Sequence, residues 1–360
     1  MVPSFALYGE PFDFRVTILL GMSSVSNFME IAMKTSVQRI FAVVFIALTS
    51  FSSLVDAQSL AKAMYRVGIL PGVSGPSPYL AAFVDGMRER GYQEGRDYVI
   101  ESRYADGKLD RLPALVAELA ALKVDVIVLS SIPAALAAQK ATTTIPIVVA
   151  AAGDFVGNGL VASLEHPGGN ITGLDEVVPG LTSRRLQLLG EAVPLNSPVA
   201  ILSSATGPTH AKQMQDAESG ARSLGIRLVT MRVSDAKEFD GAFEAMAREK
   251  ASALIVFSGV LTNIHRKRIV ELAAQYKLPA IYWNVSFMTS GGLMYYGPNL
   301  PGMFKRSASL VDKIMKGASP STLPVEYPQQ FELVINLKTA KERGITIPRS
   351  LIEKADRLID

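Results

Sequence analysis

Short apolar runs alternate with longer helical segments along most of the chain. In the first half the sequence predicts strands at four runs, which are Val67–Leu70, Tyr98–Glu101, Val126–Leu129 and Ile147–Ala150. The first, third and fourth contain no charged or polar side chain, which is typical of strands buried on both faces of a sheet. The alternation returns after about residue 180, with strands expected at Val199–Leu202, Arg227–Val233, Ala253–Phe257 and Ala280–Trp283.

Apolar residues spaced three or four positions apart predict helices between these runs. One apolar face spans Leu80–Met87 and is expected to stop at Gly91, and a stripe of leucines over Leu112–Leu122 has Asp110 as its expected cap. A helix is also expected at Asn158–Leu164. In the second half, helices are expected at Leu181–Glu191, Ala211–Leu224, Phe239–Lys250 and Asn263–Tyr276. Strands that alternate with helices of this length indicate βαβ units, parallel sheets and an α/β fold of two doubly wound lobes.

Turn-rich stretches suggest where the chain passes between the two lobes. Pro167–Asn170 lies near the first expected crossing, and Gly297-Pro298-Asn299 marks a return. We therefore expect the first lobe to comprise residues 58–175 and 297–320, and the second to comprise 176–296 and 321–360. The tail is expected to add one strand, Glu332–Ile335, and two short helices to the second lobe.

The region before residue 58 has the layout of a secretory signal peptide. Lys34 and Arg39 precede the apolar run Ile40–Leu48, and Val55-Asp56-Ala57 offers small residues to a signal peptidase. A membrane anchor is the alternative, but a spanning helix needs about 20 apolar residues. We expect translation to start at Met33, cleavage to follow Ala57, and the released protein to reside in the periplasm.

The composition argues against several classes of function. The chain has no cysteine, which excludes disulfides, thiolate nucleophiles and a lipid anchor on an N-terminal cysteine. Its formal charge of +3 is too small to indicate nucleic-acid binding. The three histidines, His166, His210 and His265, show no metal-binding spacing, and no nucleophile elbow, phosphate loop or dinucleotide fingerprint is present. We expect no catalysis, no cofactor and no metal.

Several segments together resemble a known family. The longest is KVDVIVLSSIPAALAAQKATTTIPIVVAAAGDFVGNGLVASLEHPGGNITGL, over Lys123–Leu174, and others are YRVGILPG (Tyr65–Gly72), GGLMYYGPNL (Gly291–Leu300) and FELVINLKTAKERGITIP (Phe331–Pro348). In their order along the chain they closely resemble the ABC-transporter substrate-binding proteins, a family that includes tryptophan and tyrosine binders. One departure is Gly153-Asp154-Phe155-Val156, where the family usually has proline in place of Phe155. That change frees the backbone and is expected to put an aromatic ring near the ligand.

The resemblance implies a fold and a function. The fold would be that of type I periplasmic binding proteins, with two lobes joined by crossing strands. The protein would be a monomer that captures a small molecule, such as an amino acid or a related carboxylate, and presents its closed form to an ABC permease in the inner membrane. The alternative is a sensor that presents its closed form to a membrane kinase or chemoreceptor. An enzyme on this fold is a third reading, which the missing cysteines and nucleophile–base pairs disfavour.

Ligands of open α/β sheets bind beyond the carboxyl ends of the strands, where following helices also point their N-termini. The loops after the expected strands are rich in small polar residues that could hold a ligand. Our candidate ligand-binding residues are Gly72, Ser74, Ser130, Ser131, Asp154, Thr206, Ser258, Asn284 and Tyr296.

Each of these candidates has a structural alternative. Ser130 and Ser131 precede Pro133 and could simply cap a helix. Asp154 could bind an ammonium or hydroxyl group of the ligand, or serve as a turn residue. Trp283, Tyr295 and Tyr296 could stack on a flat ligand, or pack in the core or the hinge. The basic run from His265 to Arg268 is expected to be a solvated helix face, with docking to the permease as the alternative.

Overall fold

The computed structural model describes residues 64–71, 77–204 and 209–360, all of which belong to one compact unit, Met64–Asp360. The predicted signal peptide and the candidates Gly72, Ser74 and Thr206 lie outside the described residues. None of the described helices is long and apolar enough to cross a membrane.

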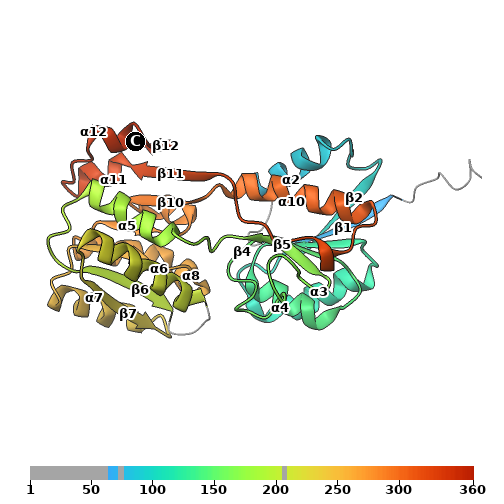
Figure 1. The fold of residues 1–360 in the computed structure, drawn as a ribbon, viewed down its shortest axis with the longest axis horizontal. Helices are drawn as coiled ribbons and strands as arrows, with labels where there is room; N and C mark the ends of the chain where they lie inside the picture. Colours follow the sequence, from blue (N-terminus) through green and yellow to red (C-terminus); the bar gives the residue numbers. More distant parts are fainter. Residues whose placement is uncertain (1–63, 72–76, 205–208) are drawn as a thin grey trace, which may run out of the picture. The chain divides into compact units, whose positions relative to one another are not determined.

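The first sheet has five parallel strands in the order β2-β1-β3-β4-β5. They are β1 (Tyr65–Leu70), β2 (Tyr98–Ser102), β3 (Val126–Leu129), β4 (Ile147–Ala152) and β5 (Ile171–Asp175). Helices α3 (Leu112–Ala121) and α4 (Ile132–Ala141) cover one face, and α2 (Pro78–Arg88) and α10 (Leu300–Met315) cover the other (Figure 1). Along β3, Ile127 and Leu129 face α3 and α4 whereas Val126 and Val128 face α2 and α10, as the two-residue period of a strand requires.

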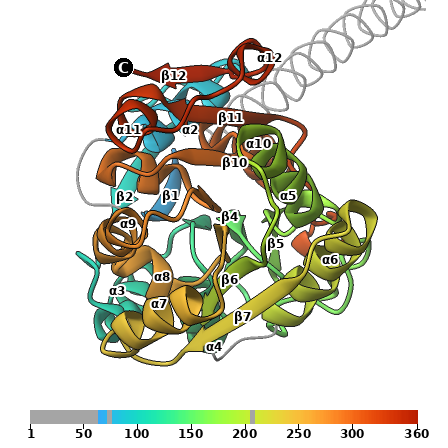
Figure 2. The ribbon, with the colours of Figure 1, turned by 90° about the vertical axis from the view of Figure 1, so that its left-hand side faces the viewer.

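The second sheet has seven strands in the order β12-β11-β10-β9-β8-β6-β7, and every neighbouring pair is parallel except β10 and β11. They are β6 (Val199–Ser204), β7 (Leu228–Val233), β8 (Ala253–Val256), β9 (Ala280–Tyr282), β10 (Met294–Pro298), β11 (Phe331–Asn336) and β12 (Arg357–Ile359). Figure 2 shows β12, β11 and β10 at one end of this sheet and β6 and β7 toward the other.

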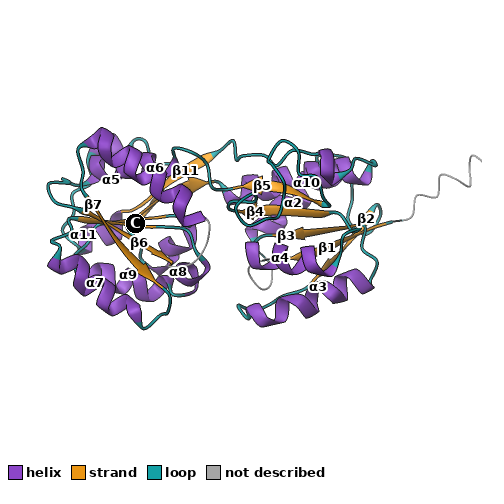
Figure 3. Ribbon diagram, turned by 60° about the horizontal axis from the view of Figure 1, so that its bottom comes forward, coloured by secondary structure: helices purple, strands orange, loops and turns teal. Residues whose placement is uncertain are grey.

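Helices cover both faces of the second sheet (Figure 3). One face carries α5 (Leu181–Ala192), α6 (Thr209–Leu224), α11 (Leu337–Glu342) and α12 (Arg349–Ile352), and the other carries α7 (Glu238–Arg248) and α9 (Arg266–Gln275). The short helix α8 (Val260–Ile264) follows β8, and 3-10 turns lie at Leu109–Arg111, Val285–Ser290 and Pro320–Thr322.

The chain passes between the two lobes at three crossings. The first crossing follows β5, the second follows β10 and the third precedes β11. The first and third crossings run side by side. Thr172 Oγ1 donates to the carbonyl of Leu323 (2.8 Å), and the Glu326 N–H donates to the carbonyl of Gly173 (2.9 Å). Gly173 is required here because a Cβ at this position would lie 2.2 Å from the Val149 carbonyl oxygen. These hydrogen bonds and the close backbone packing at Gly173 hold the first and third crossings against the first sheet.

All nine predicted strands are present, and the helical pattern holds with three corrections. Residues 158–164 form a turn followed by bends and irregular chain, so the helix expected there was wrong. Asp110 does not cap α3, because it lies in the 3-10 turn Leu109–Arg111 and no side chain caps that helix. The helix expected over Asn263–Tyr276 is broken at His265, whose φ of −96° and ψ of 20° end α8 before α9 begins.

Four elements were not predicted from the sequence, namely β5, β10, α10 and β12. Glycines and prolines inside β5 and β10, and at the start of α10, indicate turns when only local pattern is considered. Helix α10 packs on α2 in the first lobe although it follows β10 of the second sheet. The expected domain boundaries themselves stay a prediction.

Candidate functional site

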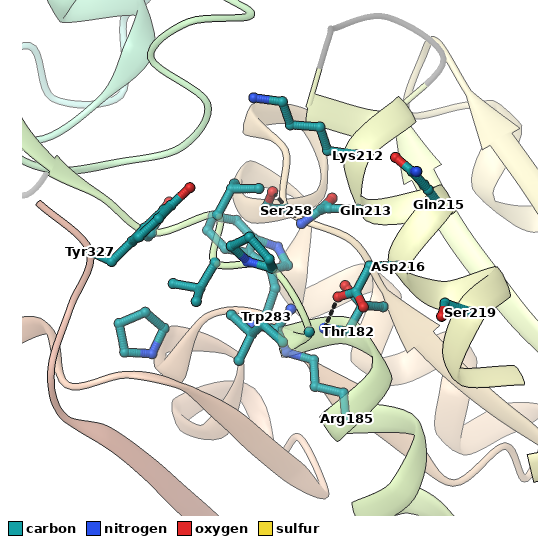
Figure 4. Close-up of a pocket in the computed structure, with 17 residues that line it drawn as sticks. Thr182, Arg185, Lys212, Gln213, Gln215, Asp216, Ser219, Ser258, Trp283 and Tyr327 are labelled. Carbon is teal, nitrogen blue, oxygen red and sulfur yellow. Dashed lines mark hydrogen bonds between the residues drawn. The ribbon is translucent and has the colours of Figure 1, made fainter. Parts of the chain in front are cut away.

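The structure contains a cavity of about 370 Å³ beside the first crossing (Figure 4). Its walls come from the crossing itself, Glu176–Gly180, the first two turns of α5, one face of α6, residues that follow β8 and β9, and the last residue of β10. Tyr327, on the third crossing, closes one side. The volume falls within the range of about 300–1,000 Å³ that is usual for small-molecule sites.

Strand ends deliver two of the lining side chains. Ser258 lies two residues after β8, and Trp283 follows β9 directly. Because β8 and β9 are parallel neighbours, their carboxyl ends open at the same edge of the sheet. This part of the cavity therefore stands where a doubly wound sheet is expected to bind a ligand.

The N-terminus of α5 is capped by a residue of another helix. Gly180 stands at the N-cap with a φ of 83° and has no side chain to offer. Asp216 of α6 replaces it, because its Oδ2 accepts the Thr182 N–H (2.7 Å) and its Oδ1 accepts the Ser183 hydroxyl (2.6 Å). The helix end that could have attracted an anion is thus already occupied by a carboxylate.

Arg185 and Glu176 are charged residues of opposite sign in the cavity wall. Arg185 is 2% exposed and donates Nε to the carbonyl of Tyr296 at 2.8 Å. Burial lowers the pKa of Arg185 to about 10, so it stays a cation at neutral pH. Burial raises the pKa of Glu176 to about 7, the charge of Asp175 raises it further, and Arg185 opposes the shift. These two residues therefore give the cavity one permanent cation and one carboxyl that titrates near neutrality.

A third charge, Lys212, is held at the cavity by the first lobe. Its ammonium forms an ion pair with Oδ1 of Asp154, which also accepts the Gly157 N–H (3.0 Å). Asp154 is fully buried and has a φ of 58°, an uncommon value for a residue other than glycine. Asp175 supports that conformation by accepting the Asp154 N–H at 2.9 Å.

Two buried polar atoms in the cavity wall have no partner among the described residues, namely Gln213 Oε1 and Trp283 Nε1. Gln213 is 6% exposed, and its Nε2 donates to Ser258 Oγ at 2.9 Å. An unpaired buried polar atom costs about 1–3 kcal/mol, so each of these two atoms lowers the stability of this conformation.

Among the candidates from the sequence, Ser258 lines the cavity, and so does Trp283. Ser131 and Asn284 cap a helix and a 3-10 turn, accepting the N–H groups of Ala134 (3.3 Å) and Ser286 (2.9 Å), and Ser130 immediately precedes Ser131. Ser130, Ser131 and Asn284 are therefore not part of the described cavity wall.

The other aromatic candidates pack against protein. Tyr296 stacks on Phe331 with ring centroids 6.0 Å apart, and Tyr295 is buried with its hydroxyl bonded to the Pro298 carbonyl (2.7 Å). Phe155 corrects an expectation, because it is 0% exposed in the core of the first lobe rather than beside the ligand site. Its N–H, which a proline would lack, donates to Asp175 Oδ2 at 3.2 Å.

Sequence reasoning missed most of the polar cavity wall, including Glu176, Arg185, Lys212, Gln213 and Asp216. The last three share one face of α6, and their helical spacing was visible in the sequence. A polar helix face usually meets solvent, however, and nothing local indicates that this one borders a cavity. In the described part of the chain, no group of three or more acidic or histidine residues could hold a metal ion.

Comparison with known proteins identifies related sequences and structures. The family model described as ABC transporter substrate binding protein matches residues 66–359. A curated tyrosine-binding protein of Clostridioides difficile is 25% identical over 282 residues, which cover 78% of this chain and 81% of that protein.

Two solved structures are similar over 82% of this chain and 100% of their own. One is an ABC domain from Streptococcus pneumonia in complex with L-Trp, with 25% identity and a TM-score of 0.74. The other is a conserved domain protein from Vibrio cholerae, with 26% identity and a TM-score of 0.72. Together with the two doubly wound lobes, these matches confirm the predicted type I periplasmic-binding-protein fold.

Proposed function

Because the chain belongs to the ABC transporter substrate binding protein family, we propose that it is the extracytoplasmic subunit of an ABC importer. In this role it captures an aromatic amino acid or a related aromatic carboxylate and delivers it to a permease. The family match supports solute binding, and the expected signal peptide supports export. The ligand class rests on the cavity and on the relatives that bind tyrosine and L-Trp.

The observation that carries the proposal is the mixture of groups in one cavity. Trp283 and Tyr327 offer rings to a flat ligand, Arg185 offers a cation to a carboxylate, and Glu176 offers an acceptor to an ammonium group. An amino acid presents these three features together. Asp154, the sequence candidate for the ammonium, acts in this proposal through Lys212, whose position it holds.

Closure of the lobes would complete the site. The crossings supply Glu176 and Tyr327, so a change of the angle between the lobes moves both residues relative to the wall from α6. A ligand drives closure only if it binds the closed form more tightly than the open form. Contacts to residues of the crossings, together with contacts to α6, provide that difference in affinity.

A thermal-shift screen tests the proposal on residues 58–360, which include the whole compact unit. The panel contains L-tyrosine, L-tryptophan, L-phenylalanine, benzoate and, as unrelated solutes, sugars. A ligand at about 100 times its Kd stabilises the native state by about 2.7 kcal/mol. We expect the aromatic compounds alone to raise the unfolding midpoint, and a folded protein that responds to none of them would refute the proposal.

A variant and an analogue together test the role of Glu176. In Glu176→Gln, we expect L-phenylalanine to bind at least about tenfold more weakly, because the variant loses a charge-assisted hydrogen bond. Binding of 3-phenylpropionate, which lacks the ammonium group, is expected to be unchanged or tighter. Equal losses for both compounds in calorimetric titrations would show that Glu176 does not contact the ammonium.

A further inference from the structure

A second cavity lies against the third crossing, and its volume of about 310 Å³ suits a small ligand. Its walls come from the end of β5, the residues that follow α2, the first two turns of α10, Asn299 of the second crossing and Tyr327–Gln330 of the third. Tyr327 lines both this cavity and the first one, which lies beside the first crossing (Figure 4). One side chain therefore connects the two cavities.

The charged side chains that line the second cavity are mostly basic. The basic ones are Arg90, Lys305 and Arg306, and Glu89 is acidic. Lys305 Nζ pairs with Oε1 of Glu89 at 2.7 Å. The Arg306 guanidinium holds both carboxylate oxygens of Glu326, at 2.7 and 2.9 Å. These two pairs neutralise Lys305 and Arg306, so the cavity retains the charge of Arg90.

Arg90 is held in position but is not neutralised. Its Nη1 donates to the carbonyl of Gly86 at 2.7 Å, near the end of α2. It forms no ion pair within the described residues, and its other guanidinium nitrogens are not among the buried atoms without a partner. Those nitrogens are therefore reached by solvent and by a ligand. The planar fork of an arginine binds a carboxylate through two parallel hydrogen bonds.

The rest of the second cavity wall suits an organic carboxylate. Met303 and Pro328 contribute apolar surface, and the side-chain amides of Gln329 and Gln330 make no hydrogen bond to the described residues. The one guanidinium without an ion pair balances the single charge of a carboxylate, whereas a phosphate dianion would keep one charge unpaired. A small carboxylate with a short apolar part is therefore the matching ligand.

The second cavity joins parts of the chain that belong to different lobes. Arg90 follows α2 of the first lobe, whereas Gln330 leads directly into β11 of the second sheet. The second and third crossings meet here, because the Asn299 N–H donates to the Gln330 carbonyl at 2.9 Å. A carboxylate that contacts both Arg90 and the third crossing stabilises one arrangement of the crossings. In that arrangement Tyr327 closes one side of the first cavity.

We propose that the second cavity is an allosteric site for a small organic carboxylate, held by Arg90 and by the amides of the third crossing. Its occupation tightens ligand binding in the first cavity, because the carboxylate favours the arrangement in which Tyr327 closes that cavity. By linkage, a ligand in the first cavity tightens binding of the carboxylate by the same factor. The coupling rests on the proposed function, whereas the carboxylate site does not.

Calorimetric titrations at constant ionic strength test the site itself, with butyrate as the probe and butyramide as its uncharged analogue. Butyrate is expected to bind at least about tenfold more tightly than butyramide, because charge-assisted hydrogen bonds are the stronger ones. Arg90→Gln is expected to abolish that difference, and Arg90→Lys, which keeps the charge, is expected to retain part of it. The control Arg88→Gln removes an arginine of α2 that pairs with Asp85 and lines neither cavity, so it is expected to retain all of it.

A second titration measures the coupling between the cavities. The Kd of L-phenylalanine is measured with and without saturating butyrate, and butyrate is expected to lower it by about fivefold. Tyr327→Ala is expected to weaken L-phenylalanine binding in both conditions and to bring the ratio of the two Kd values to about one. Arg88→Gln is expected to keep the ratio of the unaltered protein.

Three results would overturn the inference. Equal binding of butyrate and butyramide, or equal losses in Arg90→Gln and Arg88→Gln, would remove Arg90 from the site. Weaker binding of L-phenylalanine in butyrate would place butyrate in the first cavity, and an unchanged Kd would mean that the two cavities are independent. If no aromatic compound binds, the proposed function fails and the coupling fails with it, but butyrate binding that depends on Arg90 still supports the second site.

Discussion

Replacing Asp175 tests how the first crossing is held. This carboxylate is 3% exposed and accepts three backbone N–H groups. Oδ1 receives those of Asp154 and Val177, each at 2.9 Å, and Oδ2 receives that of Phe155 at 3.2 Å. One side chain therefore joins the end of β5 to the loop after β4, and it orients the residue that pairs with Lys212.

The magnitude follows from these three hydrogen bonds. Hydrogen bonds to a charged group contribute about 1.5–3 kcal/mol each, so their loss in Asp175→Ala would cost about 4.5–9 kcal/mol. Burial raises the pKa of Asp175, which shows that its charge is partly desolvated, and removing the charge recovers some of that cost. We therefore expect the free energy of unfolding to fall by about 3–5 kcal/mol, a large share of the 5–15 kcal/mol typical of native proteins. Asp175→Asn keeps one acceptor oxygen and should lose about 1–2 kcal/mol.

Urea unfolding followed by far-UV circular dichroism measures these losses. Trp283 fluorescence, followed in parallel, reports on the second lobe and shows whether the lobes unfold together. Asp110→Ala removes an exposed aspartate and should change the free energy of unfolding by no more than about 0.5 kcal/mol. If Asp175→Ala costs no more than this control, the three N–H groups do not depend on the carboxylate and the reasoning is wrong.

Three further predictions concern other parts of the site. The raised pKa of Glu176 means that its contribution to stability is fully present below pH 4.5 and is lost as the pH rises through about 7. Glu176→Gln should therefore flatten the pH dependence of unfolding across that window, which corresponds to at most about 3 kcal/mol. Phe155→Ala should lower the free energy of unfolding by about 3–5 kcal/mol, because it leaves a cavity in the core of the first lobe. Lys212→Met should cost about 1–2 kcal/mol, less than a fully buried pair, because the lysine side chain is 53% exposed.

Each of these predictions has a matched comparison. A pH profile of Glu176→Gln that parallels the wild type would show that other groups cause the dependence. Phe155→Leu should recover most of the stability lost in Phe155→Ala, and failure to do so would point to a role other than packing. Adding Asp154→Asn to Lys212→Met should restore part of the loss, and purely additive effects would mean that the ion pair contributes nothing.

The sequence predicted the helices that cover the sheets where their apolar stripe was continuous. It did not predict a helix that begins with residues typical of turns. Helix α10 begins Leu300-Pro301-Gly302, which locally resembles a loop, yet proline suits the first turn of a helix. Asn299 completes that start by accepting the Gly302 N–H at 2.7 Å. Strand β5 was missed for a similar reason, since its Gly173 is needed for contact with Val149 and not for a turn.

The sequence by itself determined the strands, most helices and the two-lobed α/β class, because buried parallel strands and amphipathic helices each leave a local periodic signature. It also placed Ser258 and Trp283 near a strand end, since that position follows from where a strand stops. Only the tertiary structure decided which polar residues border the cavity. Gln213 and Asp216 sit on a helix face that looks solvent-exposed in sequence, and they line a cavity because α5, the crossings and two strand ends pack around them. Contacts between segments so distant along the chain leave no periodic trace in either one.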